Sequence, residues 1–309
     1  MSEQDRPRIV VTGPTGWIGS ALLTRIAHLY GPGWDRSVLL FGSRGAEIVA
    51  PDGAVLRIRP LCELAPKDVA GAVVIHLAYL TKEKVELLGE ARFVAENLAI
   101  DQLVFTAFAD AAPRAVFVAS SGAAALAADG RDRHPYGCAK LRQEDRMLEW
   151  AARSGVPAIA GRIWNLTGPF INKIGSYAIA DMLIQARATG RIRIAARVPV
   201  FRSYLHVSDL CDLILLASIG RIGHAEPIDL CGAETLEMSD IARQIAVLVG
   251  LSADAIERAP VVFDRPSAYL GQFALTKALA MRVDQVLLPF AQQLADTDRW
   301  LHAGRPRKA

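Results

Sequence analysis

The sequence is poor in cysteine, nearly neutral in charge and without a long apolar run. Four cysteines occur in 309 residues, and their spacing fits neither a disulfide framework nor a zinc site. The six histidines show no ligand pattern either, so we expect reduced thiols and no metal. A net charge of +3 is too small to indicate nucleic acid or a membrane surface as a partner.

The apolar stretches also fall short of the roughly 20 residues that a membrane span needs. The polar beginning of the chain, residues 1–6, is not typical of a signal peptide. Hydrophobic residues nevertheless make up 52% of the sequence and charged residues 22%, which favours a folded protein with a sizeable core. We therefore expect a cytoplasmic protein that binds neither a membrane nor nucleic acid.

Short apolar runs alternate with longer helical patterns along the first half of the chain. Strands are predicted at residues 8–11, 38–41, 54–58, 73–77, 115–119 and 158–163, and a helix at 17–30. This alternation is typical of a parallel sheet covered on both faces. We expect an α/β protein with a Rossmann-type doubly wound parallel sheet in residues 1–165 and a smaller C-terminal lobe in residues 166–309. Some segments of the lobe, about 199–231, are expected to return to the main domain.

The first strand runs directly into a glycine-rich turn that opens the helix. The turn reads Thr12-Gly13-Pro14-Thr15-Gly16-Trp17-Ile18-Gly19. Gly13 allows a tight turn, Gly16 lets a pyrophosphate approach the backbone, and Gly19 lets the helix pack close to its strand. The helix N-terminus then offers free N–H groups to phosphate oxygens. Because the glycines follow a strand and open an amphipathic helix, the turn indicates dinucleotide binding.

Two further segments form a proton-transfer constellation. The fifth strand ends in Ser120-Ser121, and Tyr136-Gly137-Cys138-Ala139-Lys140 follows in a predicted helix. Tyr136 and Lys140 are four residues apart, so a helix places them on one face. A free tyrosine has a pKa near 10. A lysine cation ~4 Å away could stabilise the tyrosinate by up to ~4 kcal/mol at an effective dielectric constant of ~20, or about 3 pK units.

The G-x-x-G-x-x-G turn, the Ser-Ser strand end and the Y-x-x-x-K pair together resemble one family over nearly the whole chain. It is the extended short-chain dehydrogenase/reductase family, in its nucleotide-sugar-modifying, NAD-dependent epimerase/dehydratase branch. The resemblance implies that Tyr136 is the general acid/base, and that Lys140 tunes it and holds the nicotinamide ribose. It also implies that Ser121 hydrogen-bonds the reacting oxygen. Ser120 is the alternative for that role.

The same resemblance implies a cofactor site assembled from segments of the whole first half of the chain. The residues expected to contact the cofactor are Gly13, Thr15, Gly16, Trp17, Ile18, Ser43, Arg44, Leu77, Ala78, Tyr79, Asn97, Ala119, Tyr136, Lys140 and Ile163.

The second predicted strand indicates which nicotinamide is preferred. An acid that binds the ribose ends this strand in NAD-dependent enzymes. Here the strand reads Val38-Leu39-Leu40-Phe41-Gly42-Ser43-Arg44, without an acid. Arg44 and the Ser43 hydroxyl could bind a 2′-phosphate, which a carboxylate would repel. We therefore expect NADP(H) to be preferred, with NAD(H) possible.

The resemblance further implies a nucleotide-sugar substrate bound by the C-terminal lobe. The segment from Arg162 to Pro169 is similar to the start of the family's substrate lobe, where Asn165 stands at a position that contacts the diphosphate. The segment from Arg202 to Asp209 is similar to the family's R-D-[FY]-[IV]-x-V-x-D segment, with Ser203 in place of the first aspartate. The expected substrate-binding residues are Ser121, Asn165, Arg202 and, across an alignment gap, Arg265.

The sequence leaves several activities open. No Asp-Glu pair follows Ser121, which argues against the 4,6-dehydratases that the family contains. The leading hypothesis is an NADPH-dependent reductase of a nucleotide-linked 4-keto-deoxyhexose. The alternatives are a nucleotide-sugar C4 epimerase with a retained NAD, a reductase of a non-sugar secondary metabolite, and a cofactor sensor without catalysis. The intact Ser, Tyr and Lys speak against the sensor, which needs none of them.

Family members often form homodimers through a four-helix bundle. The corresponding helices here are predicted at residues 85–109 and 136–152. The second carries Leu141, Leu148 and Ala152 near one face. A helix packed on the sheet needs the same stripe, so this pattern supports a homodimer only in combination with the resemblance.

Overall fold

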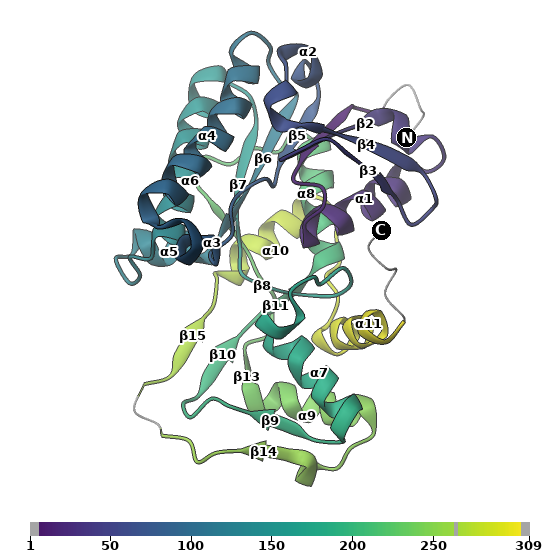
Figure 1. The fold of residues 1–309 in the computed structure, drawn as a ribbon, viewed down its shortest axis with the longest axis vertical. Coiled ribbons are helices and arrows are strands. Elements are labelled where there is room, and N and C mark those ends of the chain that lie inside the picture. The colour runs from purple at the N-terminus through teal and green to yellow at the C-terminus, as the bar shows by residue number, and fades with distance from the viewer. Residues whose placement is uncertain (1–5, 263–264, 304–309) are drawn as a thin grey trace.

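A large, mostly parallel sheet forms the centre of the molecule (Figure 1). The computed structural model describes residues 6–262 and 265–303, so nearly all of the polar N-terminal segment lies outside it. The sheet order is β12-β7-β6-β5-β1-β2-β4-β3, and only β3 runs antiparallel to its neighbour. The strands are β1 (Ile9–Thr12), β2 (Val38–Gly42), β3 (Ala46–Val49), β4 (Val55–Pro60), β5 (Val73–His76), β6 (Ala115–Ser121), β7 (Ala158–Ile163) and β12 (Ile228–Leu230).

The strand order reverses direction between β1 and β5. The chain builds outward from β1 to β2 and β4, then crosses back to β5 and builds outward to β6 and β7. This is the doubly wound topology, and it confirms the predicted fold class. Parallel strands reach their carboxyl ends at the same edge, so the switch point at that edge is where such folds bind ligands.

Helices cover both faces of the sheet, as Figure 1 shows. On one face lie α1 (Trp17–Tyr30) and α8 (Val207–Ile219); on the other lie α2 (Pro66–Val69), α4 (Glu90–Ala109) and α6 (Pro135–Ser154). Successive strand residues point to opposite faces. Accordingly, Ile9 and Val11 are buried against α1 and α8, whereas Val10 is buried against α2 and α4.

The predicted bounds are confirmed for α1 and corrected for the helix expected at 85–109. That helix is two helices, α3 (Lys84–Leu88) and α4, because Gly89 at their junction adopts a φ of 76°. Between β6 and α6 the chain forms the short helix α5 (Gly122–Ala128), which the sequence patterns did not indicate.

The second half of the chain adds smaller sheets and five more helices of at least ten residues within the described ranges. β8 (Asn165–Thr167) pairs with β11 (Tyr204–His206), β9 (Ile192–Ile194) with β14 (Ile256–Arg258), and β10 (Val200–Arg202) with both β13 (Leu236–Glu237) and β15 (Ser267–Tyr269). The helices are α7 (Ala178–Thr189), α8, α9 (Met238–Val249), α10 (Phe273–Arg282) and α11 (Phe290–His302). α8 and β12 pack into the main sheet, whereas α7, α9 and β9 share a separate apolar core.

Within the described residues, no helix combines the length and the apolar character that crossing a bilayer requires.

Candidate active site

The glycine-rich turn lies against the ends of the two strands beside β1. Gly13 has a φ of 71°, and its N–H donates to the carbonyl of Phe41 on β2 at 2.8 Å. A Cβ at Gly13 would lie 2.9 Å from the amide nitrogen of Ala78, which follows β5. Any other residue would therefore push β1 and β5 apart. The Thr12 hydroxyl oxygen reinforces this junction, because it accepts from the N–H groups of Leu77 and Ala78 at 3.1 Å each.

Gly16 has a different reason to be glycine. A Cβ there would meet only the Gly13 carbonyl, at an ordinary 3.6 Å, so the packing of the chain itself does not require glycine. Gly16 is also the residue that precedes α1, and it supplies no side-chain cap for the first N–H groups of the helix. Open space next to uncapped helix N–H groups fits the diphosphate of a dinucleotide. The turn is therefore suited to the diphosphate of the dinucleotide that its sequence predicts.

Other predicted cofactor residues lie along the same edge of the sheet. Asn97 of α4 is buried and accepts from the Leu80 N–H at 2.8 Å, which holds the segment after β5 in place. Ile163 ends β7 and pairs in register with Ser121. Ser43 and Arg44 follow β2 and are exposed. No hydrogen bond or ion pair engages the Arg44 guanidinium within the part of the chain that the structure describes.

Three hydroxyl groups converge at the end of β6. The Ser121 hydroxyl lies 3.5 Å from the phenol oxygen of Tyr269 on β15, and it is close enough to the Tyr136 phenol to lower the pKa of that phenol. Ser121 also caps α5 by accepting from the Ala123 N–H at 3.2 Å. Ser120 points to the opposite face of the strand, where it donates to the buried carboxylate of Glu144. The geometry therefore supports Ser121, and not Ser120, as the serine beside Tyr136.

Lys140 lies one helical turn beyond Tyr136 on α6 and is 4% exposed. Its amine donates to the Ala119 carbonyl at 2.6 Å and to Gln143 Oε1 at 3.0 Å. It also lies 3.6 Å from the centre of the Tyr79 ring, whose face attracts a cation. Tyr79 in turn packs edge-on against Tyr136 at 6.5 Å between ring centres.

The electrostatics of Tyr136 differ from the expectation. Burial raises the pKa of Tyr136 to about 12, and the hydrogen bond from Ser121 opposes this only in part. The sequence argument placed the Lys140 cation against the phenol. In the structure the amine is instead engaged by Ala119, Gln143 and the Tyr79 ring. Desolvation therefore dominates, and Tyr136 is a neutral phenol at physiological pH.

Of the predicted substrate-binding residues, Asn165 and Arg202 have contacts with the β15 segment that carries Tyr269, whereas Arg265 lies in the loop before it. The Asn165 amide nitrogen donates to the carbonyls of Ser203 and Tyr269 at 3.1 and 3.3 Å, so a contact with a diphosphate would have to replace these bonds. Arg202 pairs in register with Tyr269, and its guanidinium donates to the Ser267 carbonyl at 3.2 Å without a carboxylate partner among the described residues. Arg265 is exposed in the loop before β15, whereas Tyr269, which lies 3.5 Å from Ser121, is at the end of that strand.

Two aromatic residues at the site were missed by the sequence analysis. Trp164 packs against Tyr269 at 4.5 Å between ring centres, and its ring occupies the space next to Gly122 and Gly271. A Cβ on Gly122 would lie 2.5 Å from the Trp164 ring. The short segment around β15 carries no periodic signal that could have identified Tyr269. Only the two glycines and the Ala-rich α5 hinted that large side chains fill this space.

Trp17 and Glu83 connect the main domain to the lobe. The Trp17 indole N–H donates to the Pro169 carbonyl at 2.6 Å, and its ring packs against Tyr177 at 5.0 Å. Lys173 forms an ion pair at 2.8 Å with Glu83, which precedes α3. The loop that follows β8 therefore covers the start of α1.

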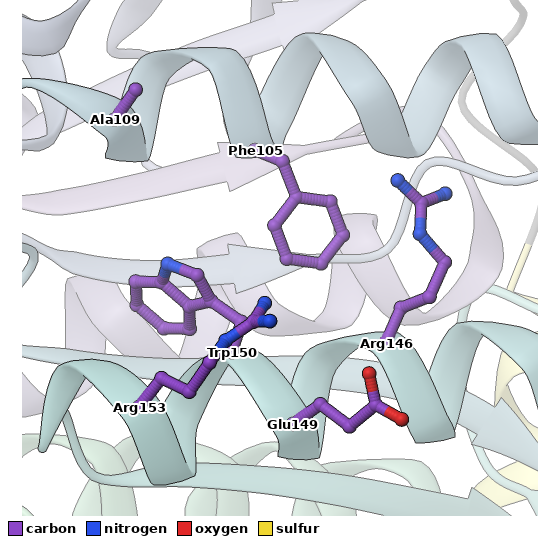
Figure 2. Close-up of a pocket in the computed structure, with 6 residues that line it drawn as sticks. All are labelled: Phe105, Ala109, Arg146, Glu149, Trp150 and Arg153. Atoms are coloured by element: carbon purple, nitrogen blue, oxygen red, sulfur yellow. The ribbon is translucent and has the colours of Figure 1, made fainter.

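A separate hollow of about 380 Å³ lies on the outer side of α4 and α6. Figure 2 shows its lining, which consists of Phe105 and Ala109 on α4 and Arg146, Glu149, Trp150 and Arg153 on α6. None of these residues lies at the carboxyl edge of the sheet, so we assign the hollow no part in the active site.

The fold and the constellation at its edge are those of a dinucleotide-dependent enzyme with a Ser-Tyr-Lys set. The profile of the NAD-dependent epimerase/dehydratase family matches residues 9–220. The chain belongs to this family, as the resemblance implied.

Solved structures with the same fold cover almost the whole chain at low identity. UDP-N-acetylglucosamine 4-epimerase from Methanobrevibacter ruminantium M1 superposes with a TM-score of 0.75 at 17% identity, over 97% of this chain and 99% of that one. A double mutant of the dTDP-glucose 4,6-dehydratase DesIV from Streptomyces venezuelae, with NAD bound, gives 0.72 at 18%, over 96% and 98%. MoeE5 in complex with UDP-glucose and NAD gives 0.70 at 21%, over 96% and 99%. A comparison with curated proteins gave no match.

The electrostatics predict an unusual alkaline titration. All six tyrosines have a raised pKa, in each case chiefly through burial: Tyr30, Tyr79, Tyr136, Tyr177, Tyr204 and Tyr269. After a rapid jump to pH ~10, where free tyrosine is half ionised, the native protein should show little tyrosinate absorbance. The urea-unfolded chain should show the ordinary signal. An ionisation at or below pH ~10 that disappears in Tyr136→Phe would contradict the neutral phenol.

Proposed function

We propose that the protein is an NADPH-dependent reductase that reduces the C4 ketone of a nucleotide-linked deoxyhexose. The observation that carries this proposal is the placement of the Tyr136 phenol beside the Ser121 hydroxyl at the strand end, where burial raises the pKa of the phenol to about 12. Reduction of a ketone needs a proton donor at the reacting oxygen, whereas oxidation of an alcohol needs a base. A phenol held protonated by burial suits the first task.

The residues of the chain divide the work as follows. A bound nicotinamide supplies the hydride to the carbonyl carbon. Ser121 donates a hydrogen bond to the carbonyl oxygen and holds it next to Tyr136, which transfers its phenolic proton to that oxygen. The product is the alcohol, and the tyrosinate is reprotonated from solvent. Lys140 would bind the nicotinamide ribose by exchanging one of its three present acceptors for a ribose hydroxyl, and its charge would favour the transient tyrosinate.

A nucleotide-sugar substrate is supported by Arg202 beside the site, whose guanidinium has no carboxylate partner among the described residues. An arginine whose guanidinium donates only to neutral oxygen atoms keeps its charge available for phosphate oxygens. Arg265 and the Asn165 amide are the further candidates. Two of the structurally similar proteins were solved with nucleotide sugars, namely MoeE5 with UDP-glucose or UDP-glucuronic acid and the epimerase from Methanobrevibacter ruminantium M1 with UDP-N-acetylmuramic acid.

The preference for NADP(H) rests on Ser43 and Arg44. The phosphate turn contacts the end of β2 through the Gly13–Phe41 bond, so these two residues lie close to the turn. Both are exposed, and no acidic side chain occupies the strand end. Because cells usually keep NADPH reduced, this preference also favours reduction over a self-contained epimerase cycle, for which NAD is the retained cofactor.

Dehydration is disfavoured by the segment that follows Ser121. Eliminating water requires an additional acid and base, but α5 consists only of glycine, alanine and leucine. The epimerase is the second candidate, since it uses the same Ser121, Tyr136 and Lys140. A tightly held NAD in the freshly purified protein would favour the epimerase, and a protein that is purified without nicotinamide and prefers NADPH would favour the reductase.

Replacement of Tyr136 tests the reaction. With NADPH and a panel of nucleotide 4-keto sugars, Tyr136→Phe should lower turnover by about 10²–10⁴-fold, the usual contribution of a general acid. NADPH binding should remain nearly unchanged, because the phenol is not a phosphate ligand. The matched control is Tyr30→Phe, which removes a hydroxyl that donates to the Pro7 carbonyl, away from the site. Full activity in Tyr136→Phe would refute the proposed mechanism.

Replacement of Arg44 tests the cofactor preference. Arg44→Ala should weaken NADPH binding by ~1.5–3 kcal/mol, the range for hydrogen bonds to charged groups, and should barely change NADH binding. Arg193→Ala removes an exposed arginine of β9 and serves as the control. Titration of both nicotinamides by fluorescence gives the two dissociation constants. An equal loss of affinity for NADPH and for NADH would show that Arg44 does not bind the 2′-phosphate.

We also propose that the protein is a homodimer in which α4 and α6 face the same helices of a second copy. The outer surface of these helices carries Leu98, which is 40% exposed, and the half-buried rings of Phe105 and Trp150. The hollow of Figure 2 would then lie inside the interface.

Light scattering after size exclusion tests the homodimer. The wild-type protein should have the mass of two chains, and Leu98→Glu should shift it to the mass of one, because a carboxylate would be buried in the interface. Val247→Glu alters an equally apolar residue that is 80% exposed on α9 and should have no effect. A wild-type monomer, or a Leu98→Glu dimer, would exclude this interface.

A further inference from the structure

Five buried polar side chains form a continuous chain of hydrogen bonds between the main sheet and the α4–α6 layer. They come from β1, β5, α4 and α6, and none is more than 4% exposed: Thr12, His76, Asp101, Gln143 and Lys140. The chain begins at the glycine-rich turn and ends at the lysine beside Tyr136. None of the roles assigned above accounts for Asp101 or Gln143.

The hydrogen bonds define the direction of each donor. The Thr12 oxygen already accepts from two backbone N–H groups, so its single proton goes to His76 Nδ1 at 2.7 Å. His76 must then carry its own proton on Nε2, which donates to Asp101 Oδ1 at 3.1 Å. The imidazole is therefore neutral in this arrangement.

The carboxylate of Asp101 in turn orients the amide of Gln143. Asp101 Oδ1 accepts from Gln143 Nε2 at 2.6 Å, which requires the NH₂ group to face the carboxylate. The opposite end of the amide, Oε1, then faces Lys140 and accepts from its amine at 3.0 Å. With the Ala119 carbonyl and the Tyr79 ring face, the amine has three acceptors. Three acceptors suit an ammonium group, which has three N–H bonds.

Two carboxylates act on the lysine, and they differ in their own partners. Glu144 forms an ion pair with Arg162 at 2.8 Å and also accepts from Ser120, so its charge is already compensated. Asp101 accepts only from the neutral His76 and Gln143, and no cation contacts it among the described residues. The charge of Asp101 is therefore balanced by Lys140, one amide away. This arrangement opposes burial, which lowers the pKa of Lys140 to about 7.

We propose that Asp101 and Gln143 are positioning residues for Lys140, which keep its buried amine protonated and fixed behind Tyr136. The inference rests on the proposed function for its catalytic meaning, because it is there that Lys140 holds the ribose and favours the tyrosinate. The bonding chain itself does not depend on the identity of the substrate.

Other charged or titratable groups face the lysine from each element packed around it. They are Glu144 and Tyr136 on its own helix, Arg162 on β7 through Glu144, His76 on β5 through Asp101, and Tyr79 after β5. Of these groups, only Glu144 adds a further negative charge, and it is retained in every variant below. A change in the titration of Lys140 on replacing Asp101 can therefore be attributed to Asp101.

The test follows the titration of Lys140 directly. The chain has seven lysines, so carbon-13 NMR of lysine-labelled protein gives few signals, and the loss of one in Lys140→Arg assigns Lys140. Asp101→Asn removes the charge but leaves an oxygen that can accept the same two bonds. Its Lys140 midpoint should fall by at least about 1 pH unit from the wild-type value near 7, the effect expected of a nearby opposite charge. Gln143→Met, which keeps the side-chain length, should also lower the midpoint.

Asp298→Asn is the matched control, because it neutralises a buried carboxylate that pairs with Arg187 in the lobe. It should leave the Lys140 midpoint unchanged. An unchanged midpoint in both Asp101→Asn and Gln143→Met would overturn the inference, as would a fall of equal size in the control. If one of these two variants fails to fold, the Lys140 midpoint of the other variant tests the inference.

The pH dependence of turnover links this titration to the reaction. Turnover should fall as pH rises and Lys140 loses its proton. In Asp101→Asn this loss of activity should begin at a lower pH than in the wild type, and kcat should change more than the KM for NADPH. If the midpoint shifts but no nucleotide 4-keto sugar is reduced by the wild type, the positioning residues stand and the proposed function falls. If the wild type reduces a nucleotide 4-keto sugar and the Lys140 midpoint does not shift in the variants, the proposed function stands and the positioning roles of Asp101 and Gln143 are refuted.

Discussion

The central strands run parallel, and this single constraint brings the functional groups together. The strands present their carboxyl ends at one edge, so the glycine-rich turn after β1, Leu77 and Ala78 after β5, and Ser121 at the end of β6 become neighbours. The Thr12 hydroxyl and the Gly13–Ala78 contact then set the spacing of the turn. Residues more than a hundred positions apart in the sequence thus belong to one site.

The same architecture makes polar groups at this edge costly. A parallel sheet is covered by helices on both faces, so side chains near its edge are withdrawn from water. An unpaired buried polar group costs about 1–3 kcal/mol, and a charge costs more. The Lys140 charge is stabilised by interactions with the Ala119 carbonyl, Gln143 and the Tyr79 ring. The Glu144 charge is stabilised by Arg162 and Ser120. Tyr136 avoids a buried charge because it remains a neutral phenol.

The fold class and the elements that carry motifs could be predicted from the sequence, because their signals are local. The turn at Gly13, Gly16 and Gly19, the helix at 17–30 and the pairing of Tyr136 with Lys140 on one helix depend on residues within a few positions of each other. The break at Gly89 was missed because apolar spacing continues across it.

The remainder of the site depends on contacts between distant segments. Tyr269 reaches Ser121 from a strand of three residues, too short to show a period. Asp101 and Gln143 read as ordinary polar residues on amphipathic helices, and only the packing of α4 on α6 turns them inward. The direction of the Tyr136 pKa shift was not foreseen, because the sequence contains the lysine but not the depth at which the phenol is buried.

The buried chain from Thr12 to Lys140 also restricts how this protein can vary. Each inner member satisfies two neighbours, so replacing one leaves a donor or an acceptor stranded in a dry interior. Replacing an inner member by an apolar residue therefore costs least when its partner is replaced as well. Asp101 and Gln143 lie 42 positions apart, and we expect their substitutions to be correlated among related sequences. A related sequence that has an apolar residue at one of these positions should have lost the polar partner at the other.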